Sequence, residues 1–330
     1  MEEQRRKCKL FDCHAHLNDK LFNSHDALSE LLAEAEASGV TDIVSVTCSS
    51  LDIERMLNIS SLQAAGVNIH RAIGLHPEYA SLQELELVMK AIETHKKELI
   101  CIGEIGLDFR PHVLKRSPLS EDETKNLQAE VFKTQARRAA ELGLPVNVHS
   151  CAAGRHALAA LAAVGCPAAV LHAFDGRAHY AEAAARAHPR WFFSVPPCVV
   201  RSPVMQKLVA RVPLENLLLE SDSPALAPVQ GQTNVPANIK ISCEEIARIK
   251  NIEVSLVASA THANALRLFG IPAASSSGKE KVVDNTEQQE ITRQSKQPNQ
   301  RKKNTPLLYG QYDELETSHR YFLLINNKIW

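Results

Sequence analysis

The sequence predicts an α/β protein of the (β/α)8 TIM-barrel class with a disordered C-terminal tail. Eight short apolar or β-branched runs alternate with longer amphipathic stretches between residue 10 and about residue 270. This span is close to the roughly 250 residues that an eightfold barrel typically occupies. An open doubly wound sheet is the alternative. Its dinucleotide-binding form is disfavoured, because no G-x-G-x-x-G motif follows the first run.

Each predicted strand is a short run rich in apolar and β-branched side chains. The eight runs cover residues 9–13, 41–47, 68–75, 99–105, 145–148, 168–171, 191–195 and 216–219. Helices are predicted where apolar residues recur three and four positions apart. The clearest helical stretches cover residues 26–37, 82–96, 121–142 and 203–211.

The composition divides the chain into three parts. Residues 1–9 form a charged extension, residues 10–270 the predicted barrel, and residues 271–330 a Gln-rich, polar tail that is expected to be disordered. The run Arg301, Lys302 and Lys303 in this tail is a weak candidate for a nuclear-import signal, and a solvated charge run is the alternative.

Charge and hydropathy limit the partners and the compartment. The 37 basic and 38 acidic residues give a net charge of −1, so no broad cationic surface is available for nonspecific binding of nucleic acid. No apolar run is long enough to span a membrane, and no secretory signal begins the chain. We therefore expect an intracellular protein, cytoplasmic or nuclear, with no membrane partner. The oligomeric state is not indicated.

Ligand-type side chains occur where the predicted strands end. In a parallel barrel the C-terminal ends of all strands meet at one face, so these dispersed side chains are expected to converge. Burying imidazoles and carboxylates together at one end of a barrel costs free energy of desolvation unless these groups are paired or bind metal. The predicted ligands are His14, His16, Glu104, His149, His172 and Asp222.

Six ligands exceed what one tetrahedral ion uses, so the sequence predicts two divalent ions that share a carboxylate. Glu104 lies midway in the ligand order and is the predicted bridge. Imidazole and carboxylate together suit zinc, manganese or iron better than magnesium. The expected ions are Zn, Mn or Mg, and Mg matches this set of ligands least well. Two-metal sites of this kind recur in the hydrolysis of phosphoesters and amides.

Six short motifs in this order resemble the TatD family of metal-dependent deoxyribonucleases, within the amidohydrolase-like barrels. They are HAH after the first strand, GLHP, GEIGLDF, VNVHS, LHAFDG and ESDSP. The resemblance spans about residues 10–270 and is greatest to the third animal subtype of TatD-domain protein. It implies that His14, His16, Glu104 and Asp222 surround one ion. Glu104, His149 and His172 would surround the other.

The resemblance also implies a reaction, the hydrolysis of DNA phosphodiester bonds by a metal-activated water, including exonuclease action from the 3′ end. Glu104 and Asp222 are the predicted catalytic carboxylates, and Asp222 is the expected acceptor of the water's proton. His76 of GLHP would contact the scissile phosphate, with a structural role before Pro77 as the alternative. Asp108 and Glu220 are expected to orient ligands.

Arginines follow four of the predicted strand ends and are candidate phosphate contacts, since their planar fork matches phosphate oxygens. Ordinary solvent-exposed loop arginines are the alternative. The four candidates are Arg110, Arg155, Arg177 and Arg201. They would compensate for the absent broad basic surface and for the arginine that family members commonly carry where this chain has Cys151. Family members also commonly carry an Arg-Asn-Glu-Pro run where this chain has Thr233, Asn234, Val235 and Pro236.

Two other functions remain open. The same barrel serves small-molecule hydrolases of amides, lactones or phosphoesters, and the near-neutral charge favours that alternative, whereas the loop arginines favour the nuclease. A non-catalytic metal-binding protein whose tail binds partners is the third. All six predicted ligands are present, which argues against it, because a scaffold needs no open two-metal site.

Overall fold

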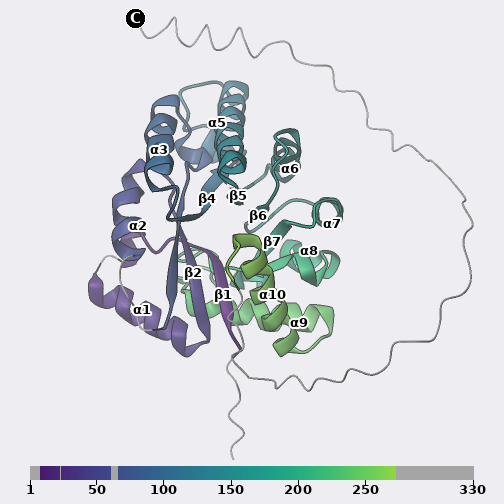
Figure 1. Cartoon of the computed structure of the whole chain (residues 1–330). Helices are drawn as coiled ribbons and strands as arrows, with labels where there is room; N and C mark the ends of the chain where they lie inside the picture. Colours follow the sequence, from purple (N-terminus) through teal and green to yellow (C-terminus); the bar gives the residue numbers. More distant parts are fainter. Residues whose placement is uncertain (1–7, 23, 61–65, 273–330) are drawn as a thin grey trace, which may run out of the picture. The chain divides into compact units, whose positions relative to one another are not determined.

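The computed structural model describes residues 8–22, 24–60 and 66–272. Eight parallel strands close into one barrel in chain order, and Asp12 of β1 pairs with Leu219 of β8 to complete it (Figure 1). The predicted eightfold barrel is confirmed. The strands are β1 (Leu10–Ala15), β2 (Val40–Val46), β3 (Asn68–Ile73), β4 (Leu99–Gly106), β5 (Val146–His149), β6 (Ala169–Leu171), β7 (Trp191–Val195) and β8 (Leu217–Leu219).

Helices lie around the barrel (Figure 1). Helices α1 to α8 connect successive strands, and α9 and α10 follow β8. They are α1 (His25–Ala37), α2 (Ile53–Ser60), α3 (Leu82–His95), α4 (Pro111–Leu114), α5 (Glu121–Leu142), α6 (Gly154–Ala163), α7 (Ala178–Ala187), α8 (Pro203–Arg211), α9 (Ile239–Lys250) and α10 (Val254–Phe269). The four helices predicted most clearly, α1, α3, α5 and α8, agree with their predicted ranges to within one residue. The start of α5 has a capping box, in which Ser120 and Glu123 bond each other's backbone N–H.

Alternate residues of the strands belong to two different cores, as the period of two in a strand requires. Trp191 and Phe193 pack with the surrounding helices, whereas Phe192 between them packs with residues of the other strands. This second cluster contains residues of most of the strands and of a single helix, α10, so it fills the barrel interior. Phe269 of α10 stacks on Phe11 of β1 with ring centroids 5.5 Å apart, which places α10 against one end of the interior.

Some sequence predictions fall outside the described part of the chain. Residues 1–7 of the predicted extension and residues 273–330 of the predicted tail are not described, and neither is the basic run at residues 301–303. Within the residues that are described, no helix is long and apolar enough to cross a membrane.

Candidate metal centre

The first half of the site joins the two ends of the barrel sheet. His14 lies in β1, His16 follows it, and Asp222 comes three residues after β8. The Nε2 atoms of the two histidines are 3.3 Å apart, and Asp222 Oδ1 is 3.4 Å from His14 Nε2 and 3.3 Å from His16 Nε2. The backbone N–H of Asp222 donates to the carbonyl of His14 at 2.9 Å. This bond helps to hold Asp222 in a left-handed conformation, φ 52°, which is rare outside glycine and common at functional sites.

The second half of the site comes from β5 and β6. His149 is the last residue of β5, and His172 directly follows β6. His149 Nδ1 lies 3.1 Å from His172 Nε2. Both side chains are buried, and the two rings come from neighbouring strands whose parallel register brings their ends together. The sequence prediction that these histidines converge agrees with this geometry.

Glu104 of β4 lies between the two halves, and its two oxygens face different histidines. Oε2 is 3.7 Å from His14 Nε2 and 3.6 Å from His16 Nε2. Oε1 is 2.7 Å from His149 Nδ1 and 2.8 Å from His172 Nε2. The carboxylate is only 2% exposed. This is the arrangement that a bridging carboxylate requires, because each oxygen is directed at one pair of imidazoles.

For His14 and His149, the partner of the outer ring nitrogen indicates which nitrogen bears the proton. Asn147 Nδ2 donates to the carbonyl of Cys13, so its Oδ1 accepts from His14 Nδ1–H at 2.9 Å. The Nε2 lone pair of His14 therefore faces the centre. On the opposite side His149 Nε2–H donates to Asp108 Oδ2 at 3.2 Å, which leaves Nδ1 as the nitrogen that would bind a metal ion. Carboxylates and carbonyls orient metal-binding histidines in this way.

His76 differs from the four other histidines. The ring is buried, and its Nδ1 accepts a hydrogen bond from the backbone N–H of Glu78 at 3.1 Å. The proton therefore lies on Nε2, which is 3.8 Å from Glu104 Oε1. Burial and the nearby His149 lower the pKa of His76 to about 3, so the ring is neutral at pH 7. A neutral ring with its N–H directed at the centre suits a hydrogen-bond donor and not a metal ligand.

The ionisation states divide the carboxylates into two groups. Burial alone would raise the pKa of Glu104, but the histidines around it hold that pKa well below its ordinary value. His14 and His16 likewise lower the pKa of Asp222 against the effect of burial. Burial raises the pKa of Glu220, behind His172, to about 8. Glu104 and Asp222 at the centre are thus ionised at pH 7, and Glu220 is mostly neutral.

The donor set fits divalent metal ions. Ligand atoms bound at 2.0–2.2 Å to one tetrahedral ion lie roughly 3.3 to 3.6 Å apart. In the first half of the site the distances are 3.3 to 3.7 Å. They separate His14 Nε2, His16 Nε2 and Asp222 Oδ1 from one another, and the two nitrogens from Glu104 Oε2. The distances among Glu104 Oε1, His149 Nδ1 and His172 Nε2 are 2.7 to 3.1 Å, below this range, so these three atoms would move apart to hold an ion. Two groups of imidazole and carboxylate donors therefore share one glutamate.

Side chains that the sequence analysis did not single out position this centre. Ser194 of β7 donates to Glu220 Oε2 at 2.5 Å, and the backbone N–H of Ala173 donates to Glu220 Oε1 at 2.8 Å. Two buried glutamines of α5, Gln128 and Gln135, donate to and accept from the backbone of the loops after β4 and β3. Gln128 and Gln135 are seven residues apart and so lie on the same face of α5. Two polar residues on the buried face of an amphipathic helix were the sequence feature that could have identified them.

The four candidate arginines have different surroundings. The Nε and Nη2 atoms of Arg110 donate to the carboxylate of Asp108. The hydrogen bonds from His149 and from Arg110 together hold the pKa of Asp108 low despite burial. Arg201 donates to the carbonyl of Ala227 at 3.1 and 3.2 Å. Arg155 and Arg177 are exposed and form no ion pair with any residue that the structure describes. The latter two are therefore the freer of the four to bind an external anion.

Of the positions that depart from the family pattern, Cys151 lies beside the site, and Thr233 and Val235 flank a residue that contacts the loop of Asp222. Cys151 is half-buried and lies within 4.8 Å of Asp108 and His149, measured between their ligand-type atoms. Thr233 is exposed and Val235 is partly buried. Asn234 between them is buried and donates to the carbonyl of Ser221 at 2.6 Å, so this segment holds the loop that carries Asp222.

Comparison with known proteins identifies the family. Residues 11–270 match the family model described as TatD related DNase. The chain belongs to the TatD family. Human "Deoxyribonuclease TATDN3" is 39% identical over 267 residues, which is 79% of this chain and 94% of that protein. The match confirms the predicted family and, at the level of the family, the predicted class of metal-dependent hydrolase.

More distant TatD proteins share the same extent and fold. A Bacillus subtilis protein named "Uncharacterized metal-dependent hydrolase YabD" is 32% identical over 79% of this chain and 99% of its own length. The crystal structure of YJJV, a TatD homologue from Escherichia coli, superimposes with a TM-score of 0.69 at 25% identity, covering 80% of this chain and 99% of that one.

Proposed function

We propose that this TatD protein hydrolyses DNA phosphodiester bonds with two divalent metal ions bound per chain. The observation that carries the proposal is the position of Glu104, whose two oxygens face two separate pairs of imidazoles. His14, His16 and Asp222 would hold one ion together with Glu104, and His149 and His172 would hold the other. Four nitrogen donors favour zinc or manganese over magnesium.

The chain's own groups support hydrolysis at this centre. When bound, a pair of divalent ions lowers the pKa of a water molecule and neutralises charge on the phosphoryl oxygens. Asp222 directs Oδ1 at the two histidines, and its second oxygen would accept the proton of the attacking water. His76 Nε2–H would donate to a phosphoryl oxygen. Arg155 and Arg177 would bind flanking phosphates, while Arg110 mainly fixes Asp108 and through it His149.

Cleavage of a labelled single-stranded oligonucleotide in the presence of Mn²⁺, Zn²⁺ or Mg²⁺ tests this function. Glu104→Ala and Asp222→Asn should each lower turnover by at least about 100-fold, because outer groups that merely orient ligands already contribute about 10 to 100-fold. Asp122→Asn, which changes a 94% exposed carboxylate of α5, is the matched control and should leave turnover unchanged. Metal-dependent turnover that survives Glu104→Ala would disprove the proposal.

A small-molecule phosphoester, amide or lactone hydrolase is the second candidate, and the net charge of −1 favours it. The same preparation separates the two. A DNA hydrolase cleaves the oligonucleotide efficiently, whereas a small-molecule hydrolase cleaves only activated esters or lactones in a Glu104-dependent manner. No Glu104-dependent turnover of either substrate would favour the non-catalytic metal-binding protein.

A further inference from the structure

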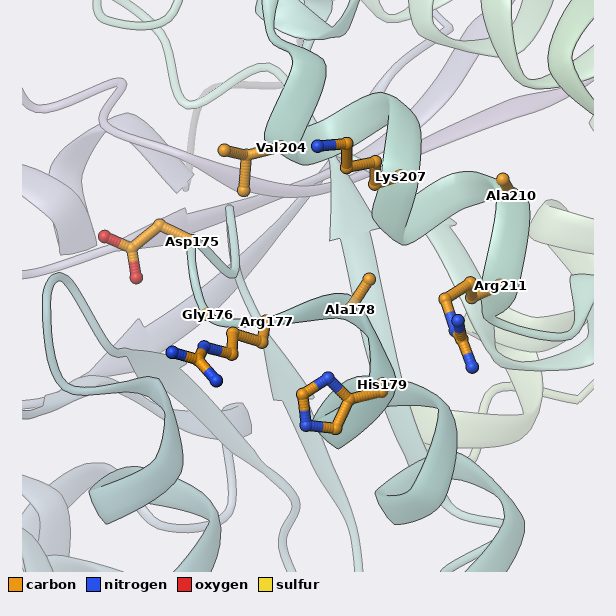
Figure 2. Close-up of a pocket in the computed structure, with 9 residues that line it drawn as sticks. All are labelled: Asp175, Gly176, Arg177, Ala178, His179, Val204, Lys207, Ala210 and Arg211. Atoms are coloured by element: carbon orange, nitrogen blue, oxygen red, sulfur yellow. The ribbon is translucent and has the colours of Figure 1, made fainter.

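A groove of about 490 Å³ lies between α7 and α8 (Figure 2). We call it the α7–α8 groove. Its lining combines small or medium apolar side chains, among them Ala178, Val204 and Ala210, with longer charged side chains, which we call the rim. The lining residues are Asp175, Gly176, Arg177, Ala178, His179, Val204, Lys207, Ala210 and Arg211.

The rim of the groove is predominantly cationic. Arg177 and Lys207 form no ion pair with any residue in the described ranges, and both are exposed. Arg211 Nε donates to Glu182 Oε2 at 2.7 Å, but Glu182 also contacts Arg186, so one carboxylate serves two guanidinium groups. These cations contrast with the net charge of −1 of the whole chain.

The single acidic side chain of the groove already has a partner. Asp175 Oδ2 accepts a hydrogen bond from the backbone N–H of Ala152 at 2.9 Å. Asp175 therefore joins the loop after β6 to the loop after β5, and it forms no ion pair with Arg177. Figure 2 shows Asp175 and Arg177 at one end of the groove and Arg211 at the other, with His179 and Lys207 between them.

The groove begins at the same rim of the barrel as the metal centre. Arg177 follows the ligand His172 by five residues. Five residues span at most about 17 Å. The phosphates of one DNA strand follow each other at about 3.4 Å along a helix axis, so this end of the groove lies within about five nucleotides of the metal centre. From there α8 carries Lys207 and Arg211 away along its length.

We propose that the α7–α8 groove binds successive backbone phosphates of the DNA strand whose scissile bond lies at the metal centre. This inference rests on the proposed function. Arg177 supplies a planar fork and Lys207 a compact point charge, both suited to phosphate oxygens. Apart from the rim charges and His179, the lining side chains are apolar and include no amide, so we expect the groove to bind the strand without reading its bases.

The binding test uses the Glu104→Gln variant, which is expected not to cleave, and a fluorescein-labelled thymidine strand of about 20 nucleotides, longer than typical single-strand sites. Adding Lys207→Glu or Arg177→Glu should weaken binding about tenfold. Each Ala replacement should reduce the slope of log K against log salt by about 0.7. Lys90→Glu on the exposed face of α3 is the matched control and should change neither quantity.

Cleavage by the otherwise unmodified enzyme gives an independent readout. Lys207→Glu should raise KM for the long strand and leave kcat unchanged. Hydrolysis of bis(p-nitrophenyl) phosphate, which is too small to reach the groove, should be unaffected. Equal losses on both substrates would indicate a structural defect and overturn the proposal, as would binding and salt slopes that match the control. Polyglutamate binding as tightly as the oligonucleotide would also overturn it, because the groove would then accept an acidic polypeptide.

The two proposals fail separately. If the wild-type protein does not cleave DNA but binds it with an affinity that Lys207→Glu lowers, the proposed function fails, and of the groove assignment only the binding of backbone phosphates stands. If the wild-type protein cleaves the long strand and Lys207→Glu leaves its KM unchanged, the assignment of the groove fails and the proposed function stands.

Discussion

Gly106→Ala tests whether the backbone after β4 sets the position of a metal ligand. Gly106 has φ +148°, a conformation that side chains of L-residues rarely adopt, and a Cβ built there lies 2.0 Å from the carbonyl oxygen of His149. Real Cβ atoms essentially never approach within 3.0 Å, so the two backbones must separate by at least 1 Å. The carbonyl that must move belongs to a predicted ligand and accepts the N–H of Leu107 at 3.0 Å.

Gly106→Ala is expected to lower both the stability of the fold and the function of the metal centre. Backbone strain at this φ contributes about 1 to 3 kcal/mol of destabilisation. Displacement of the ligand by about 1 Å should lower turnover about 100-fold, and metal affinity by about 10 to 100-fold. Thermal melting followed by circular dichroism measures the first effect and establishes that the variant is folded. Titration with zinc against a competing chelator measures the second.

Gly143→Ala is the matched control for this prediction. Gly143 ends α5 with φ +69°, and a Cβ there meets nothing within 4 Å. This variant should lose about 1 kcal/mol of stability and bind metal like the wild-type protein. A folded Gly106→Ala protein with wild-type metal affinity would refute the reasoning, because the close approach would then not position the ligand.

Three further predictions concern groups behind the site. Arg110→Ala should weaken metal binding about tenfold by releasing Asp108, and an unchanged chelator titration would reject that role. Glu220 has a pKa of about 8 against an ordinary 4.5. The folded protein therefore binds the extra proton between these values, and the stability of the metal-free protein should fall by at most about 1.4 kcal/mol per pH unit as pH rises through this window. Burial also raises the pKa of Asp12, to about 7, so Glu220→Gln should show a smaller decline than the wild-type protein in urea unfolding, and an identical pH profile would contradict the assignment. Gln135→Leu leaves the buried N–H and C=O of Leu75 without their partner. We expect a loss of about 2 to 4 kcal/mol, and a loss below about 1 kcal/mol would show that other groups compensate.

Much of the centre was predictable because its ligands lie at strand ends. Parallel strands in a closed barrel leave one face for their C-terminal ends, so His14, His149 and His172 had to approach one another once the barrel was established. Glu104 was predicted as the bridge from its place midway in the ligand order. The structure adds the physical reason, which is that β4 lies in the barrel between the strands that carry the two groups of histidines.

The roles of individual polar side chains were not predictable in the same way. Arg110 and Arg177 look alike in the sequence, each a few residues beyond a strand end, but one faces Asp108 and the other has no ionic partner in the described chain. Which of them is free depends on loop conformation. Lys207 and Arg211 are spaced like an ordinary solvated helix face, and only the packing of α8 beside α7 makes them part of a groove.

The central claim is that one glutamate bridges two ions, and the metal stoichiometry at equilibrium tests it most directly. After dialysis against zinc or manganese and removal of free metal, mass spectrometry of the wild-type protein should find two ions per chain, and the folded Glu104→Gln protein should retain fewer. A single ion in the wild-type protein, or two ions in the Glu104→Gln variant, would contradict the account.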